Sequence, residues 1–162
     1  MSNFYDDAKF GVIERKWFGL TKKHGGETAT GFTFGTTDAT AITHLARHYP
    51  KGPIKLLKAG AYVLATVGGG GTVFDRVPAR LRVNGSNESA AFTISDAAAP
   101  YSISSTTTFT NDVVDAGSYV GFYTGTPESS NGTAGNTATV TGSVAFFVDY
   151  RRVFTSDGKW DS

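Results

Sequence analysis

The sequence predicts an all-β protein, an antiparallel β-sandwich of jelly-roll type. Short apolar segments alternate with polar residues at a period of two more often than apolar residues recur at helical spacing. Glycine, threonine and serine dominate the stretches between these segments. The chain holds roughly eight to ten such segments, a number that indicates a sandwich or a barrel.

The length of 162 residues fits one domain with a buried core. Charged residues make up only 18% of the chain and hydrophobic residues 40%, which favours a folded body over disorder. We divide the chain into an extended N-terminal arm at 1–10, a β-sandwich domain at 11–155 and a C-terminal tail at 156–162. Because the chain contains no cysteine, it has no disulfide and no thiolate site.

The first elements are predicted as short strands near residues 10–18 and 31–35. The segment 38–49 fits two structures, because Asp38 could cap a helix whose apolar residues recur at helical spacing. A strand over 41–49 is preferred, since residues 50–53 then form a short turn into the next strand.

Residues 54–67 are the most apolar part of the chain and predict a central strand. Gly60 interrupts this segment, so we expect a kink or bulge near it. The four glycines at 68–71 predict an abrupt, flexible turn.

A hairpin is predicted after this turn. Residues 78–83 alternate arginine with apolar residues, Asn84 and Gly85 tolerate the positive φ of a tight turn, and Phe92 and Ile94 mark the returning strand. Further short strands are expected at 106–110 and 118–124, and an exposed loop at 129–136.

The clearest alternation runs over residues 137–154. Its apolar residues share one parity, which predicts one buried face and one mostly wet face. The residues expected on the buried face are Val140, Val144, Phe146, Val148, Tyr150 and Phe154.

Motifs for chemistry are incomplete, so we predict no enzyme, no catalytic residue, no cofactor and no metal. His44 and His48 lack a third ligand nearby and are interpreted as surface or interface histidines. The glycines at 68–71 lack the Lys-Ser/Thr of a phosphate loop, and Ser118 lies in no nucleophile elbow. Asp149 is expected to form exposed ion pairs with the neighbouring arginines at 151 and 152.

Charge and hydropathy exclude two classes of partner. The net charge is only +1 and the basic residues are scattered, so we expect no nucleic acid partner. The apolar stretch 56–67 is too short to span a membrane, and residues 1–10 contain no apolar core of a secretion signal. We therefore expect a soluble protein made in the cytoplasm, with no membrane partner.

Aromatic residues in the two polar ends are the candidate partner-binding residues. Phe4, Tyr5 and Phe10 lie in the N-terminal arm and Trp160 in the C-terminal tail. Large aromatic side chains on such segments can anchor contacts with another surface. The alternative, in which each tail folds back onto its own domain, stays equally open.

Several stretches resemble small β-rich virion proteins of tailed bacteriophages, especially capsid decoration or cement proteins. They are residues 50–56 (PKGPIKL), 60–63 (GAYV), 115–120 (DAGSYV) and 144–153 (VAFFVDYRRV).

The resemblance implies a β-sandwich that binds the major capsid protein, or another virion protein, on the outside of a capsid and stabilises the shell. It also implies a homo-oligomer, with a trimer favoured, and a location in the virion. The alternative function is a receptor- or carbohydrate-binding sandwich of a tail fibre or spike, with Tyr101, Tyr123 and Asn131 on its binding loops.

Overall fold

The computed structural model describes residues 12–18, 47–70, 76–95, 98–125 and 139–153. These residues form nine strands: β1 (Glu14–Phe18), β2 (Ile54–Gly70), β3 (Arg76–Val83), β4 (Ser86–Asn87), β5 (Phe92–Ser95), β6 (Ile103–Thr106), β7 (Val113–Val114), β8 (Val120–Thr124) and β9 (Thr139–Arg152). The described ranges contain no helix, and hence none long and apolar enough to cross a bilayer.

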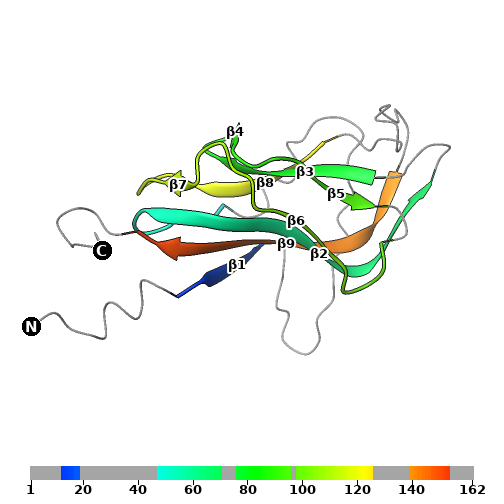
Figure 1. Ribbon diagram of the computed structural model, residues 1–162. Helices are drawn as coiled ribbons and strands as arrows, with labels where there is room; N and C mark the ends of the chain where they lie inside the picture. Colours follow the sequence, from blue (N-terminus) through cyan, green and yellow to red (C-terminus); the bar gives the residue numbers. More distant parts are fainter. Residues whose placement is uncertain (1–11, 19–46, 71–75, 96–97, 126–138, 154–162) are drawn as a thin grey trace, which may run out of the picture.

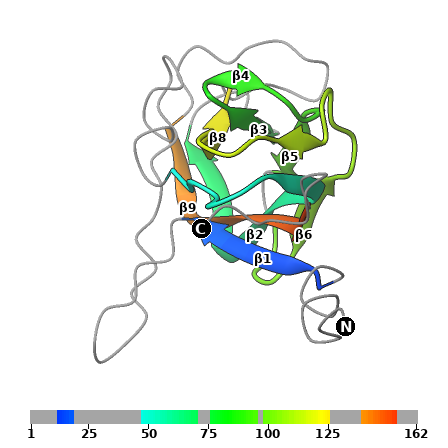
Figure 2. The same cartoon turned by 90° about the vertical axis from the view of Figure 1, so that its left-hand side faces the viewer.

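The strands form two antiparallel sheets, which confirms the predicted all-β class. The first sheet has the order β1-β9-β2-β6, with β7 also paired to β2. The second sheet has the order β4-β3-β5, with β8 also paired to β3. Figures 1 and 2 show the two sheets as separate layers. The jelly-roll connectivity stays a prediction.

The core lies between the two layers and is rich in aromatic rings. Phe122 of the second sheet stacks on Phe146 of the first at 4.8 Å between ring centroids and meets Phe18 edge-on at 5.2 Å. Phe92 reaches Phe146 from β5 at 6.4 Å. Since these contacts cross from one sheet to the other, each sheet buries its apolar face against its partner.

The central strand β2 is confirmed, and register shifts lie on both sides of Gly60, near the predicted position. Leu56 pairs with Tyr150 and Lys58 with Asp149, so Leu57 is the extra residue of a β-bulge. The bulge brings Ile54 and Leu56 onto the same core-facing side as the odd-numbered residues after it. Two more register shifts, between Val63 and Ala65 and between Ala65 and Gly68, follow along the strand.

The turn predicted at residues 68–71 is wrong for the described part of that segment. Gly68, Gly69 and Gly70 belong to β2 and pair with Thr141, Val140 and Thr139 of β9. Glycine is tolerated there because the long partner strand β9 completes the hydrogen-bond ladder.

The prediction for β9 is confirmed on one face and wrong on the other. Val144, Phe146, Val148 and Tyr150 belong to the core, as expected. Ala145, Phe147 and Asp149, on the opposite face, are also buried. The outer face of β9 is therefore covered rather than wet between Ala145 and Asp149, whereas Arg151 is exposed.

The hairpin after β3 is confirmed. Asn84 and Gly85 have φ values of 50° and 87°, which fit a tight turn of the type that joins twisted antiparallel strands. The Asn84 amide also accepts a hydrogen bond from the Tyr119 N–H at 3.0 Å and donates one to the Ser118 hydroxyl at 3.1 Å. This turn is thereby tied to the start of β8.

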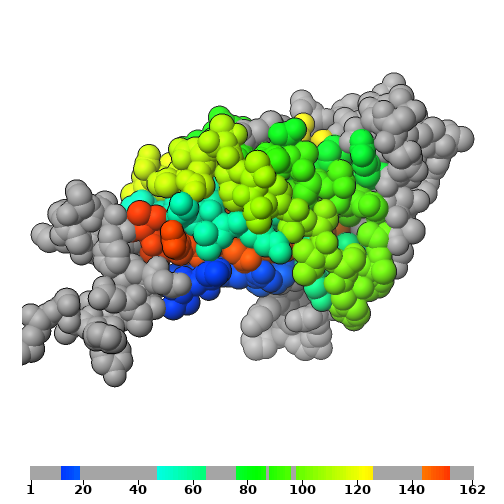
Figure 3. All heavy atoms as spheres, in the orientation of Figure 1, coloured from blue at the N-terminus to red at the C-terminus, as the bar shows by residue number. Residues whose placement is uncertain are grey.

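The strand expected at 106–110 is only partly found, because β6 ends at Thr106. The chain then leaves β2 and crosses to the second sheet, where Phe109 bridges Ser89, before β7 returns to β2. Figure 3 shows the yellow-green atoms of this part of the chain covering the near side of the molecule, above the teal atoms of β2. We call residues 107–112 the crossing segment.

The strand predicted at 31–35 and most of the ambiguous segment 38–49 lie outside the described residues. At the end of that segment, His48 forms an isolated β-bridge with Val120 of β8. Its backbone N–H and carbonyl both bond Val120, at 3.0 and 2.8 Å.

Candidate interaction surface

The four residues predicted to bind a partner, Phe4, Tyr5, Phe10 and Trp160, all lie outside the described residues. Their role stays a prediction. Within the described part of the chain, the outer side of the first sheet gathers a different set of aromatic residues. We call this surface the outer aromatic face and define it by Trp17, Tyr62, Tyr101, Ile103 and Phe147.

Strand register places these residues side by side. Trp17 of β1 pairs with Phe147 of β9, and Phe147 pairs with Gly60 of β2. Tyr62, two residues after Gly60, pairs with Ala145 on one side and Ile103 on the other. Residues directly opposite each other in an antiparallel pair point to the same side of the sheet. The first row across the outer face is therefore Trp17, Phe147 and Gly60, and the second is Ala145, Tyr62 and Ile103.

Gly60 makes room for the first row. A Cβ built on Gly60 would lie 2.8 Å from Cζ of Phe147 and 2.6 Å from the Ser104 carbonyl oxygen. The Phe147 ring therefore occupies the space that a side chain at position 60 would fill, and it is fully buried. A glycine opposite an aromatic residue lets the ring lie across the strand.

The exposed part of the face is a line of three rings. Trp17 meets Tyr62 edge-on at 5.9 Å between ring centroids, and Tyr62 meets Tyr101 at 6.2 Å. Tyr101 is 74% exposed, although its N–H donates to the Val63 carbonyl at 2.7 Å and its φ is 70°. Its backbone is thus fixed in an uncommon conformation while its ring remains accessible.

Arg15 covers the other end of the first row and is paired with a carboxylate. Its Nε and a terminal nitrogen donate to the two carboxylate oxygens of Asp149 at 2.6 and 2.8 Å. Its guanidinium carbon lies 4.3 Å from the Phe147 ring centroid and 5.4 Å from that of Trp17. The bond to Asp149 raises the pKa of Arg15, against a smaller opposing effect of burial.

The ion pairs predicted for Asp149 are wrong in their partner and their exposure. Asp149 is 8% exposed and binds Arg15 across the strands, while Arg152 pairs with Glu14 at 2.6 Å. Arg152 points to the opposite side of the sheet from Asp149, and Arg151 lies on the same side but about 7 Å along the strand, whereas Arg15 is directly opposite Asp149 on the adjacent strand. The charge of Arg15 is therefore balanced by that of Asp149.

His48 lines a separate pocket of about 370 Å³ beside β9. Its ring lies 5.8 Å from that of Tyr150, and its Nε2 is buried without a hydrogen-bond partner. Burial and the charge of Lys16 lower the pKa of His48, while Glu14 opposes them. Burial, followed by Glu14, raises the pKa of Tyr150. Both groups are consequently neutral near pH 7. The other residues that line the pocket are Tyr49, Pro50, Lys51, Ile54 and Arg152.

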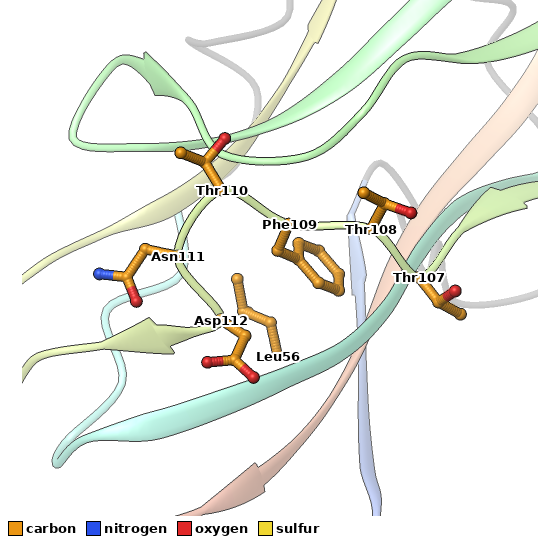
Figure 4. Close-up of a pocket in the computed structure, with 7 residues that line it drawn as sticks. All are labelled: Leu56, Thr107, Thr108, Phe109, Thr110, Asn111 and Asp112. Carbon is orange, nitrogen blue, oxygen red and sulfur yellow. The ribbon is translucent and has the colours of Figure 1, made fainter.

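Leu56 and the crossing segment line a second pocket of about 450 Å³ (Figure 4). Figure 4 shows the Phe109 ring beside Leu56, whereas the Thr110 and Asn111 side chains point away from Leu56. The acidic group of the pocket, Asp112, forms an ion pair with Lys55 at 2.9 Å. Among the described residues, no three His, Asp or Glu side chains come close enough to hold a metal ion.

The residues expected to bind a carbohydrate are not brought together. Tyr101 contacts Tyr62 on the outer side of the first sheet, whereas Tyr123 pairs with Arg80 in the second sheet. Asn131 lies outside the described residues. Tyr101 therefore belongs to the outer aromatic face, and the predicted cluster does not form around it and Tyr123.

Sequence reasoning missed Trp17, Phe147 and Arg15 as members of one surface. The available signal was the parity of Trp17 and Phe147, which is opposite to that of the core residues Phe18, Phe146 and Val148. The alternation within one strand, however, does not indicate which other strands pair with it. No known protein family matches the chain, and no curated protein is significantly similar to it in sequence.

Proposed function

We propose that this chain is a structural protein of a virion that binds the outer surface of a capsid, on the major capsid protein or another virion protein, and stabilises the shell. The partner comes from the sequence resemblance alone. The observation that supports this proposal is the exposed rings of the outer aromatic face, because such rings favour action by binding.

The composition of this face suits a protein partner. Tryptophan, tyrosine and arginine are the residue types that most often dominate the binding energy of protein interfaces. Trp17, Tyr62 and Arg15 already contact one another or share Phe147 as a neighbour. Side chains fixed before binding lose little conformational entropy on association, which favours affinity.

Stabilisation of the shell follows from mass action. A protein that binds the assembled lattice and not its separated subunits stabilises the lattice by its binding free energy. At a free concentration of 100 times Kd, the gain is about 2.7 kcal/mol for each independent site. A homotrimer would add to this gain, because its three copies of the surface would bind with a high effective concentration.

Capsids stripped of their decoration protein provide the test. The purified chain is mixed with such particles, co-sedimentation is measured, and the temperature of DNA release is recorded. We expect binding and a higher release temperature, and we expect Tyr101→Ser to weaken binding about tenfold or more. Tyr49→Ser is the matched control, because Tyr49 is also an exposed tyrosine, 55% accessible, but its ring lies beside that of Tyr119 at 5.7 Å and not on the outer aromatic face.

Further variants separate the surface from the terminal segments. Deletion of residues 1–10 tests the arm that carries Phe4, Tyr5 and Phe10, and deletion of 156–162 tests Trp160. Sedimentation velocity of the unmodified chain measures whether it is a trimer. No binding to any capsid, together with specific binding on a glycan array, would replace the proposal with the tail-fibre or spike alternative.

A further inference from the structure

The outer side of the second sheet differs from the outer aromatic face in charge. In β3, Val77, Ala79 and Leu81 point into the core, so the alternate residues Arg76, Arg80 and Arg82 lie on the outer side. The four strands of this sheet contain no Asp or Glu. The outer side of the second sheet is therefore basic along its central strand.

Two of the guanidinium groups on this side are stacked on tyrosine rings. The guanidinium carbon of Arg82 lies 3.7 Å from the ring centroid of Tyr123, and that of Arg47 lies 4.4 Å from the centroid of Tyr119. Stacking on a ring holds the guanidinium plane in place. Arg47 also has a side-chain hydrogen bond with Tyr49, and Arg82 has a further interaction within the chain.

The positions of the arginines form a row. Tyr119 and Tyr123 lie on the same side of the chain, with Gly121 between them, and Gly121 pairs with Arg82 while Tyr123 pairs with Arg80. Four residues of a strand span about 13 Å. A Cβ built on Gly121 would have no atom within 4 Å, so no side chain fills the middle of the row, although the glycine itself is buried. We call Arg47, Arg80, Arg82, Tyr119 and Tyr123 the basic face.

We propose that the basic face binds an acidic protein segment in extended conformation, with Asp or Glu at every second position. Alternate side chains of such a segment lie about 7 Å apart, which matches arginines spaced over about 13 Å. Arginine binds carboxylates through two parallel N–H···O bonds, and a guanidinium already held on a ring is oriented for this contact.

Two comparisons favour a carboxylate partner over single-stranded nucleic acid. Bases bind such surfaces by stacking on aromatic rings, but guanidinium groups already cover a face of Tyr119 and of Tyr123. Arg15 in the first sheet is an example of an arginine that lies over aromatic rings and binds a carboxylate. Its guanidinium lies over Trp17 and Phe147, and two of its nitrogens donate to the carboxylate of Asp149.

Arg47 and Arg80 are the residues to test. Arg80 donates to the Ser89 carbonyl at a long 3.4 Å, and Arg47 is exposed. Arg76 and Arg82 have further interactions within the chain, so their replacement would disturb more than this surface. Lys58→Gln is the control, because Lys58 carries the same charge on the outer side of the first sheet.

The probe is a labelled peptide with glutamate at alternate positions, compared with the same peptide carrying glutamine, by fluorescence anisotropy at about 50 and 300 mM salt. We expect the glutamate peptide to bind more tightly and to lose affinity at the higher salt concentration. Arg47→Gln and Arg80→Gln should each weaken binding about tenfold, and Lys58→Gln less than about twofold. Unchanged urea midpoints show that the variants remain folded.

Equal binding of the two peptides would overturn the proposal. Tighter binding of a single-stranded oligonucleotide that is lost in the same two variants would also overturn it, and would assign the basic face to phosphates. The result is independent of the capsid experiment, because Tyr101→Ser should leave binding of the glutamate peptide unchanged.

Discussion

At the scale of single residues, nearly all buried side-chain nitrogen and oxygen atoms of the described residues have a hydrogen-bond partner, and several of these partners lie on another strand. Asp149 is held by Arg15 of β1, and Glu14 of the same strand accepts from Tyr150 at 3.3 Å and from Arg152. The side chain of Ser89, which is buried, accepts from the Leu81 N–H at 2.8 Å. The exception in the described residues is Nε2 of His48. Replacement of Gly60 or His48 should have a measurable effect on the free energy of unfolding.

Gly60→Ala should lower the free energy of unfolding by about 1–3 kcal/mol, because the new methyl group would collide with the Ser104 carbonyl and the Phe147 ring. Gly121→Ala is the control. It should change stability by less than about 1 kcal/mol, since a Cβ there meets no atom within 4 Å. Urea denaturation measures both. Equal stability of the two variants would show that Phe147 does not occupy the space above Gly60.

The neutral state of His48 predicts how stability depends on pH. Because its pKa is lowered in the folded state, the unfolded chain binds a proton more readily once the pH falls to about 6.5, the ordinary value for histidine. The free energy of unfolding should therefore decrease as the pH falls through 6.5 toward 5. The groups around the ring are Glu14 and Lys16 from β1, and Tyr150 and Arg152 from β9.

His48→Gln tests this assignment by urea denaturation between pH 5 and 7.5. The variant should lose part of the decrease, since glutamine does not titrate in this range. An unchanged pH dependence in His48→Gln would assign the decrease to other groups.

At the scale of elements, the bulge in β2 and the crossing segment lie at the same level of the strand. On one edge of β2, Leu57 is left out of the pairing with β9. On the other edge, β7 pairs with Ile54 and Lys55, β6 pairs with residues 59–62, and the crossing segment departs between them. The Leu56 N–H donates to the Asp112 carbonyl at 2.6 Å at that point. The bulge in β2 therefore lies beside the crossing segment, which connects the two sheets there.

Deletion of Leu57 should leave a folded protein. Leu56 and Lys58 have consecutive partners in β9, so removing the residue between them keeps Ile54, Leu56 and Ala59 on the core side. Deletion of Ala61 should instead turn Tyr62 toward the core and Val63 away from it, at a cost of more than about 4 kcal/mol. Near-UV circular dichroism and urea denaturation distinguish the two. Similar loss from both deletions would argue against the bulge at Leu57.

At the scale of the whole molecule, the two sheets share one aromatic core and should unfold together. Phe122 contacts Phe18 and Phe146 of the first sheet and Phe92 of its own sheet, and it is almost fully buried. The crossing segment adds backbone bonds, from Ala90 to Thr108 at 2.9 Å and from Thr110 to Glu88 at 2.7 Å. Neither layer therefore has a core of its own.

Phe122→Ala should lower the free energy of unfolding by about 3–5 kcal/mol in a single transition. Tyr123→Ala, one residue along β8 on the outer side, should cost far less, about 1 kcal/mol, since it loses mainly the contact with Arg82. Far-UV and near-UV circular dichroism should report coincident melting curves for both variants. Two separate transitions would contradict a shared core.

The alternation of apolar and polar residues predicted where the strands lie better than how they pair. Alternation located β1, β3, β5, β8 and β9, and Asn84-Gly85 located a turn, because these signals act between near neighbours. It placed a bulge near Gly60 but did not identify Leu57 as the extra residue, because a single extra residue changes the side on which later residues point without changing composition. It also described the outer side of β9 as wet, because Trp17 and Arg15 cover Phe147 and Asp149 from a strand more than 100 residues away.

The short strands beside β2 bear on how the molecule behaves at high concentration. A long, flat edge strand offers free N–H and carbonyl groups to other chains and so invites aggregation into shared sheets. Here that edge consists of four residues in β6 and two in β7, interrupted where the chain crosses to the other layer. The opposite edge strand, β1, carries glutamate, arginine and lysine in three successive positions. Among the described strands, both edges of the first sheet thus disfavour edge-to-edge pairing between copies. The protein should therefore resist aggregation at high concentration.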